Sequence, residues 1–228
     1  MFDRVREFLR YHVESPILGW LVRRDPGMPD VERVAIWPLP GGAIRSGDIV
    51  YSGGVGEDLL LERAVADRFE ANVWAFDPTP RSIAYVERTG FVGPRRGFLP
   101  VGLWNADTTL RFHAPTDPGH VSHSVMSELG GATHFDAPCR SIPSVMRELG
   151  HDRIDVLKLN IEGAEHVVLE AMLEAGIQPR VLLISWEGDR ALAKARAWTA
   201  RLRGLGYGVA GRFGWAIAYV KASALHAP

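Results

Sequence analysis

From residue 48 onward, short apolar segments typical of buried strands alternate with segments of helical periodicity. This alternation predicts an α/β fold with a mostly parallel sheet and helices on both faces. The last two expected strands are joined by a short turn that contains glycine, which predicts an antiparallel pair at the end of the chain. Strands are expected at about 48–52, 73–76, 98–103, 109–113, 156–161, 180–186, 207–210 and 215–220, and helices at about 58–69, 81–89, 142–149, 164–175 and 190–205.

The length of the chain, 228 residues, suits one α/β domain with a full core and is short for two. We expect a helical extension and connector over 1–47 and one domain over 48–228. A formal net charge of −1 gives no electrostatic reason to expect a nucleic acid or an anionic membrane as partner. No segment approaches the ~20 apolar residues of a membrane span. The single cysteine, Cys139, excludes an internal disulfide and agrees with a reducing cytoplasm.

Polar residues cluster where two neighbouring expected strands end. Ligands of open α/β sheets bind at the carboxyl ends of the strands. Buried polar groups there cost free energy unless they are paired with one another or bind a ligand. Asn160, Glu162 and Glu187 lie at this edge. Lys158 interrupts the apolar run, so we expect it to pair with Glu162 or Glu187, or to reach the sheet edge and contact an acceptor. Glu165 is expected to face solvent or to act as a cap partner.

A glycine turn, formed by Gly53, Gly54 and Gly56, lies between the first expected strand and its helix. Glycines there let the backbone approach a ligand closely, and the free N–H groups at the start of the helix add to the site. Asp77 ends the second strand, 21 residues after Gly56 (77 − 56), and Pro78 follows it. A carboxylate in this position can accept hydrogen bonds from a ribose; a turn or cap role for Asp77 is the alternative.

Two acidic residues, Glu57 and Asp58, come directly after the glycine turn. Acidic groups early in a helix are favoured by its dipole without any function. Two carboxylates nevertheless suit the pyrophosphate of a dinucleotide poorly, whereas they suit a cofactor that carries a sulfonium and an ammonium. This comparison favours S-adenosylmethionine over NAD.

Three segments together resemble the FkbM-type methyltransferase family: Tyr51 to Asp58, Ala75 to Pro80 and Asp155 to Glu165. The last segment follows the family's D-x-x-K-x-D-x-E-G-x-E pattern closely. The resemblance covers roughly residues 45–190. It implies a Rossmann-like class I methyltransferase sheet with a C-terminal antiparallel strand, S-adenosylmethionine as cofactor, and acceptors that are mostly hydroxyl groups of sugars and natural products.

The resemblance also implies places for individual residues. Gly54 and Gly56 would approach the methionine part of the cofactor, Asp77 the ribose, and Trp104 the adenine. Asn160 stands where the family usually has Asp. A second departure is Ser52, which stands where many relatives have an acidic residue; Glu57 and Asp58 are expected to compensate.

A hydroxyl acceptor must lose its proton during methyl transfer, so a general base is expected. Glu162 is the first candidate, and a cap for the following helix is its alternative role. The stretch 114–138 reads as a long irregular loop, and such loops are often functional. His120 and His123 in this loop are further candidates for the base, and we expect no metal site although their spacing is compatible with one.

The sequence therefore predicts an S-adenosylmethionine-dependent O-methyltransferase that acts on a small molecule or sugar, with Glu187 and Lys158 near the acceptor. N- or carboxyl-methylation, a nicotinamide-dependent oxidoreductase and a non-catalytic cofactor-binding protein are the alternatives. The sequence does not decide the oligomeric state, and the apolar N-terminal segment is compatible with contact to a second subunit in a homo-oligomer.

Overall fold

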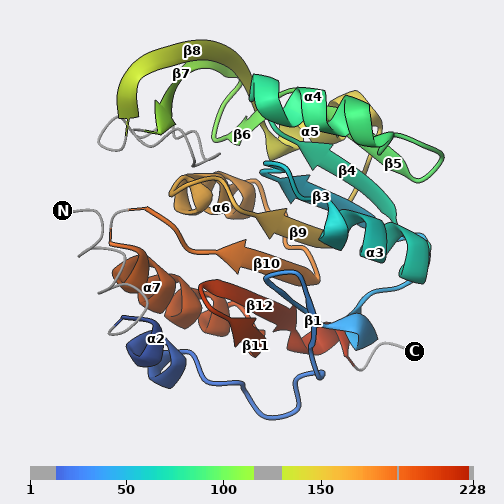
Figure 1. The fold of residues 1–228 in the computed structure, drawn as a ribbon. Helices are drawn as coiled ribbons and strands as arrows, with labels where there is room; N and C mark the ends of the chain where they lie inside the picture. Colours follow the sequence, from blue (N-terminus) through green and yellow to red (C-terminus); the bar gives the residue numbers. More distant parts are fainter. Residues whose placement is uncertain (1–13, 116–129, 189, 226–228) are drawn as a thin grey trace.

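The structure is a computed structural model that describes residues 14–115, 130–188 and 190–225 (Figure 1). Its centre is a seven-stranded sheet in the order β11-β12-β10-β9-β3-β4-β5. All neighbouring pairs are parallel except those that involve β12, which runs antiparallel to β10 and β11. The predicted mostly parallel sheet with an antiparallel strand at the C-terminal end of the chain is therefore confirmed. The strands are β3 (Ile49–Gly53), β4 (Asn72–Phe76), β5 (Arg96–Leu99), β9 (Val156–Leu159), β10 (Val181–Ser185), β11 (Tyr207–Phe213) and β12 (Ala216–Lys221).

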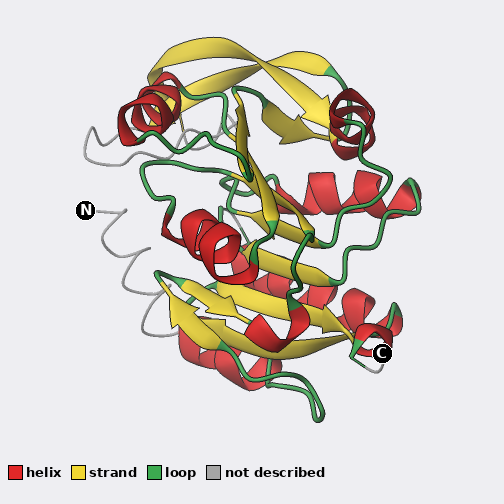
Figure 2. Cartoon of the chain, turned by 90° about the vertical axis from the view of Figure 1, so that its right-hand side faces the viewer, coloured by secondary structure: helices red, strands yellow, loops and turns green. Residues whose placement is uncertain are grey.

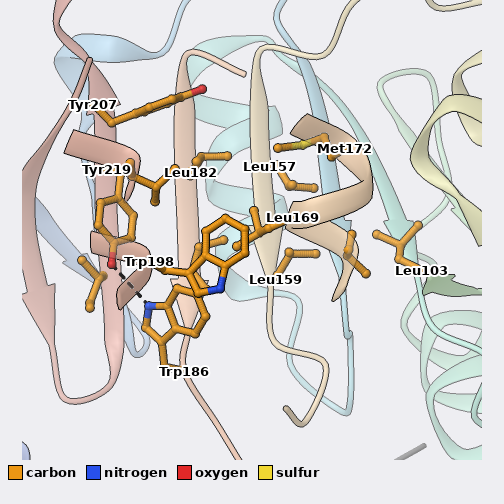
Figure 3. Close-up of a cluster of buried hydrophobic side chains, with 14 of the residues drawn as sticks. Leu103, Leu157, Leu159, Leu169, Met172, Leu182, Trp186, Trp198, Tyr207 and Tyr219 are labelled. Carbon is orange, nitrogen blue, oxygen red and sulfur yellow. Dashed lines mark hydrogen bonds between the residues drawn. The ribbon is translucent and has the colours of Figure 1, made fainter. Parts of the chain in front are cut away.

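Two layers of helices cover the sheet because successive strand residues face opposite sides. In β9, Leu157 and Leu159 pack with α2, α5, α6 and α7, whereas Val156 packs with α3 and α4. Figure 3 shows part of the first cluster, where Trp186 donates a hydrogen bond of 3.3 Å to the hydroxyl of Tyr219. The helices are α2 (Ser15–Leu21), α3 (Leu60–Phe69), α4 (Pro80–Thr89), α5 (Ile142–Leu149), α6 (Glu165–Glu174) and α7 (Ala191–Gly204).

Local signals explain why α4 and α5 begin and end where they do. Each is preceded by a hydroxyl residue, Thr79 or Ser141, whose side chain accepts a hydrogen bond from a backbone N–H of the first turn. Each has proline in its first two positions and ends at a glycine, Gly90 or Gly150, in the left-handed conformation. These signals made both helices predictable.

A second, three-stranded sheet differs from the prediction. The expected third strand at 98–103 is two strands, β5 in the central sheet and β6 (Gly102–Trp104) in the smaller one. β6 pairs parallel with β8 (Gly130–Ser141), which pairs antiparallel with β7 (Thr108–Pro115). Figure 2 shows this sheet at one end of the molecule, beyond the central sheet. The irregular loop predicted for 114–138 was wrong for 130–138, which belong to β8.

The described part of the N-terminal extension packs against both faces of the central sheet. Leu18 of α2 is fully buried in the cluster with α7, and Trp37 lies in the cluster on the α3 face. Trp37 belongs to a short hairpin of β1 (Glu32–Val34) and β2 (Trp37–Leu39). The stretch expected to be a connector therefore contributes strands and core residues. No helix among the described residues is long and apolar enough to cross a membrane.

Candidate functional site

Four loops meet at the carboxyl edge of the central sheet, where β3, β4, β9 and β10 end. The backbone N–H of Gly54 donates to the carbonyl of Phe76 at 2.9 Å, and that of Asn160 donates to the carbonyl of Gly53 at 3.0 Å. The loops after β9 and β10 also touch, since a β-carbon added to Gly188 would lie 3.2 Å from the α-carbon of Gly163. The fold thus brings together most of the described residues that the sequence assigns to the site.

The glycine turn after β3 depends on glycine at Gly54 for two reasons. Its φ of +84° lies in the left-handed region, and a β-carbon there would lie 1.9 Å from the carbonyl oxygen of Asn160. Gly56 also has positive φ, +56°, but no atom lies within 4 Å of its added β-carbon. A β-carbon at Gly53 would lie 2.9 Å from the Leu103 side chain. The close approach to the end of β9 is therefore made at Gly54.

Asp77 fixes this turn from the side of β4. One carboxylate oxygen accepts hydrogen bonds from the backbone N–H groups of Val55 and Gly56, at 2.9 and 3.0 Å. The other accepts from the backbone N–H and the hydroxyl of Thr79, at 2.9 and 2.7 Å. The turn role that the sequence left as the alternative is thus present, and the contact of Asp77 with a ribose stays a prediction. Pro78 is half-buried next to it.

The two acidic residues after the turn have partners of their own. Glu57 forms an ion pair with Arg81 of α4 at 2.6 Å and a longer one with Arg88 at 3.7 Å. The hydrogen bond from Arg81 holds the pKa of Glu57 below its usual range. Asp58 accepts from the backbone N–H of Leu60, which starts α3. Both carboxylates that the sequence assigns to the cofactor therefore already have partners within the protein, which leaves less negative charge for a cofactor than expected.

The turn between β9 and α6 carries Glu162, which is half-buried and has φ +55°. A positive φ at a residue other than glycine is uncommon and costs free energy unless its surroundings hold it. Glu165 provides that support, because its Oε1 accepts from the backbone N–H groups of Ile161 and Gly163, at 2.9 and 3.2 Å. Glu165 therefore holds the turn before α6 and does not cap the helix itself, and its expected exposure was wrong because the side chain is fully buried.

Two oxygen atoms near this turn are buried without a hydrogen-bond partner in the described part of the chain: Asn160 Oδ1 and Glu165 Oε2. Burial raises the pKa of Glu165 to about 7, backbone hydrogen bonds oppose the rise, and the nearby Glu187 adds to it. Glu187 is half-buried after β10 and accepts from the hydroxyl of Ser185 at 3.2 Å. The edge of β9 and β10 is therefore a concentration of carboxylates.

Lys158 does not lie at the open edge. Its side chain is 5% exposed, and its ammonium lies 3.5 Å from the carboxylate of Glu62 on α3. It also donates to the backbone carbonyl of Gly54. The expected pairing with Glu162 or Glu187 was wrong, because the Lys158 side chain pairs with Glu62 on the α3 face of the sheet. Its contact with an acceptor stays a prediction. Neither Glu62 nor its hydrogen bond from Ser52 was foreseen from the sequence.

Trp104 is half-buried at the end of β6, where it packs against the small cluster formed by Phe112, Ala137 and Cys139. This is the ordinary packing role of a tryptophan, and its stacking on adenine stays a prediction.

The two histidines proposed as bases, His120 and His123, lie outside the described residues. His134, which falls within the expected loop, instead belongs to β8, where it lies opposite His113 of β7. Among the described residues, no group of three or more His, Cys, Asp or Glu side chains is arranged to hold a metal ion.

Comparisons with known proteins identify one protein family and two solved structures. A family model described as the methyltransferase FkbM domain matches residues 48–208. A solved rRNA methylase from Streptococcus thermophilus is 11% identical with a TM-score of 0.43, over 78% of this chain and 89% of its own. A solved methyltransferase from Pyrococcus furiosus is 13% identical with a TM-score of 0.37, over 97% of this chain and 99% of its own. No curated protein matches the chain.

Proposed function

The chain belongs to the FkbM methyltransferase family, and on that premise we propose that it transfers a methyl group from S-adenosylmethionine to a hydroxyl oxygen of a small molecule or sugar. The observation that carries the proposal is the meeting of the glycine turn with the Asn160–Gly163 turn at the carboxyl edge of the sheet. In open α/β folds this edge is the ligand-binding edge.

The residues at the edge fit the cofactor. S-adenosylmethionine supplies a methyl group activated by a positively charged sulfur, next to an amino-acid ammonium. Asn160 Oδ1 is a buried acceptor with no donor among the described residues, next to the point where Gly54 meets β9. A buried acceptor of this kind costs free energy until it receives a hydrogen bond, and an ammonium provides one. An amide oxygen serves this purpose, so Asn160 is compatible with cofactor binding although the family usually has Asp there.

Glu162 is the residue best suited to receive the proton of the acceptor hydroxyl. It stands in the turn that touches the glycine loop, and Glu165 holds its unusual backbone conformation from both sides. A backbone held in this way limits the positions open to the Glu162 carboxylate before an acceptor binds, which lowers the entropy that positioning costs. Glu187, which follows the adjacent strand β10, is our proposed hydrogen-bond partner for the acceptor.

The first test is calorimetric titration with S-adenosylmethionine, S-adenosylhomocysteine and NAD. Micromolar binding of the first two and none of NAD is expected; binding of NAD alone would overturn the proposal. The second test is Glu162→Gln, which is expected to keep S-adenosylhomocysteine affinity near wild type and to lower turnover with hydroxylated acceptors by about 10²-fold or more.

Glu174→Gln is the control, since it removes an exposed carboxylate at the end of α6 that has no part in the proposed site. Full turnover by a folded Glu162→Gln variant would show that Glu162 is structural. Methylation of amine or carboxylate acceptors alone would instead favour the N- or carboxyl-methylating alternative. Cofactor binding without turnover across hydroxyl, amine and carboxylate acceptors would favour the non-catalytic one.

A further inference from the structure

A buried ion pair lies directly beneath the glycine turn, on the face of the sheet that α3 covers. Lys158 of β9 and Glu62 of α3 are 3.5 Å apart, and their side chains are 5% and 3% exposed. The hydroxyl of Ser52, on the neighbouring strand β3, donates to the same Glu62 oxygen. The ring of Trp37 lies 5.2 Å from the Lys158 ammonium, on the side of the β1–β2 hairpin.

Stability alone is a weak reason for such a pair. Removing two charges from water is expensive, and a buried ion pair can often be replaced by apolar side chains without loss. The Lys158 ammonium does more than neutralise Glu62, however, because it also donates to the backbone carbonyl of Gly54. Gly54 is the residue whose conformation and close packing require glycine.

The glycine turn is thus held from two directions. Asp77 accepts hydrogen bonds from the N–H groups of Val55 and Gly56, and Lys158 donates to the carbonyl that precedes them. We infer that the Lys158–Glu62 pair is a positioning pair, which fixes the glycine turn in its cofactor-binding conformation before the cofactor arrives. This inference rests on the proposed function, because it assigns the turn to S-adenosylmethionine.

The N-terminal hairpin belongs to the same arrangement. Trp37 is 4% exposed and contacts Lys158 by a cation–π interaction, which is stronger when the cation is removed from water. It lies outside residues 48–208, the range that matches the family model. A part of the chain beyond the matched domain therefore supports the cofactor turn.

The test is Lys158→Met, which keeps a similar apolar stem and removes the ammonium. We expect the dissociation constant of S-adenosylhomocysteine to rise about tenfold or more, since hydrogen bonds to charged groups are on this scale. In turnover assays the KM for the cofactor should rise more than kcat falls. Arg201→Met is the matched control: it removes the cation of an ion pair whose side chains are 42% and 45% exposed, and S-adenosylhomocysteine affinity should stay at the wild-type value.

A second readout does not depend on the cofactor. The backbone amides of residues 54–56 in the free protein should exchange with solvent about tenfold faster in Lys158→Met than in Arg201→Met, because the turn opens more often. Unchanged exchange and unchanged affinity in a folded Lys158→Met variant would overturn the inference. If that variant does not fold, Glu62→Gln decides, with unchanged affinity as the overturning result. Failure of the wild type to bind S-adenosylhomocysteine would reject the proposed function instead, while the exchange result still reports on the turn.

Discussion

Replacing Glu165 with glutamine is expected to stabilise this protein at pH 8 and to change little at pH 5. The Glu165 side chain is fully buried, and one of its oxygens accepts from the backbone N–H groups of Ile161 and Gly163. A glutamine carbonyl can accept the same two hydrogen bonds. The variant Glu165→Gln therefore removes the ionisation of the side chain and keeps its packing and its hydrogen bonds to the turn before α6.

The magnitude follows from the pKa. Burial raises the pKa of Glu165 from 4.5 to about 7, so the folded state binds the proton more tightly than the unfolded state. The contribution of this group to the unfolding free energy is fully present below pH 4.5. It is lost as the pH rises to about 7, and the unfolding free energy changes little at higher pH. At about 1.4 kcal/mol for each pKa unit, the wild type loses about 3 kcal/mol of unfolding free energy over this range. The glutamine variant does not lose it.

Urea unfolding followed by tryptophan fluorescence at pH 5, 6, 7 and 8 measures the effect. The two proteins should agree within about 1 kcal/mol at pH 5, and the variant should be more stable by about 2–3 kcal/mol at pH 8. Glu174→Gln is the control, because it removes a carboxyl from an exposed position of the same helix. Parallel stability profiles of wild type and Glu165→Gln would refute the argument that burial raises this pKa.

Three further substitutions test the glycine turn. Gly54→Ala should prevent S-adenosylhomocysteine binding and destabilise the fold, because φ is +84° and the added β-carbon would lie 1.9 Å from the carbonyl oxygen of Asn160. Gly56→Ala has open space around the added β-carbon but keeps a positive φ, so it should cost about 1–2 kcal/mol in thermal unfolding. Equal effects of the two would contradict this reading of the turn. Asp77→Ala should weaken S-adenosylhomocysteine binding by about 1–3 kcal/mol in calorimetry, through loss of the two hydrogen bonds that order the turn, and unchanged affinity in a folded variant would show that Asp77 is dispensable.

The central sheet was predictable because its signals are local. Both ends of α4 and α5 are marked in the sequence: a hydroxyl cap and a proline mark the start of each helix, and a glycine marks its end. The strands of the central sheet are apolar runs between turns, and the glycine-containing turn before β12 marks the antiparallel pair. The second sheet lacked such signals. β8 contains histidine, proline and charged residues, and its pairing with β7 depends on contacts distant in sequence, so the sequence predicts a loop over most of its length.

The partner of Lys158 shows which part of the site could still be derived from the sequence. Strand residues alternate between faces, so Lys158 had to share a face with Val156 and not with Leu157 or Leu159. Its partner had to come from an element that covers that face. Glu162 and Glu187, the partners expected from the sequence, follow the ends of β9 and β10 and are therefore excluded. The sequence does not tell which helix covers that face. The face that each helix covers depends on how the chain crosses over between the strands before and after it. Once α3 covers β3 and β9, Glu62 is the carboxylate that meets Lys158, and the pair supports the glycine turn.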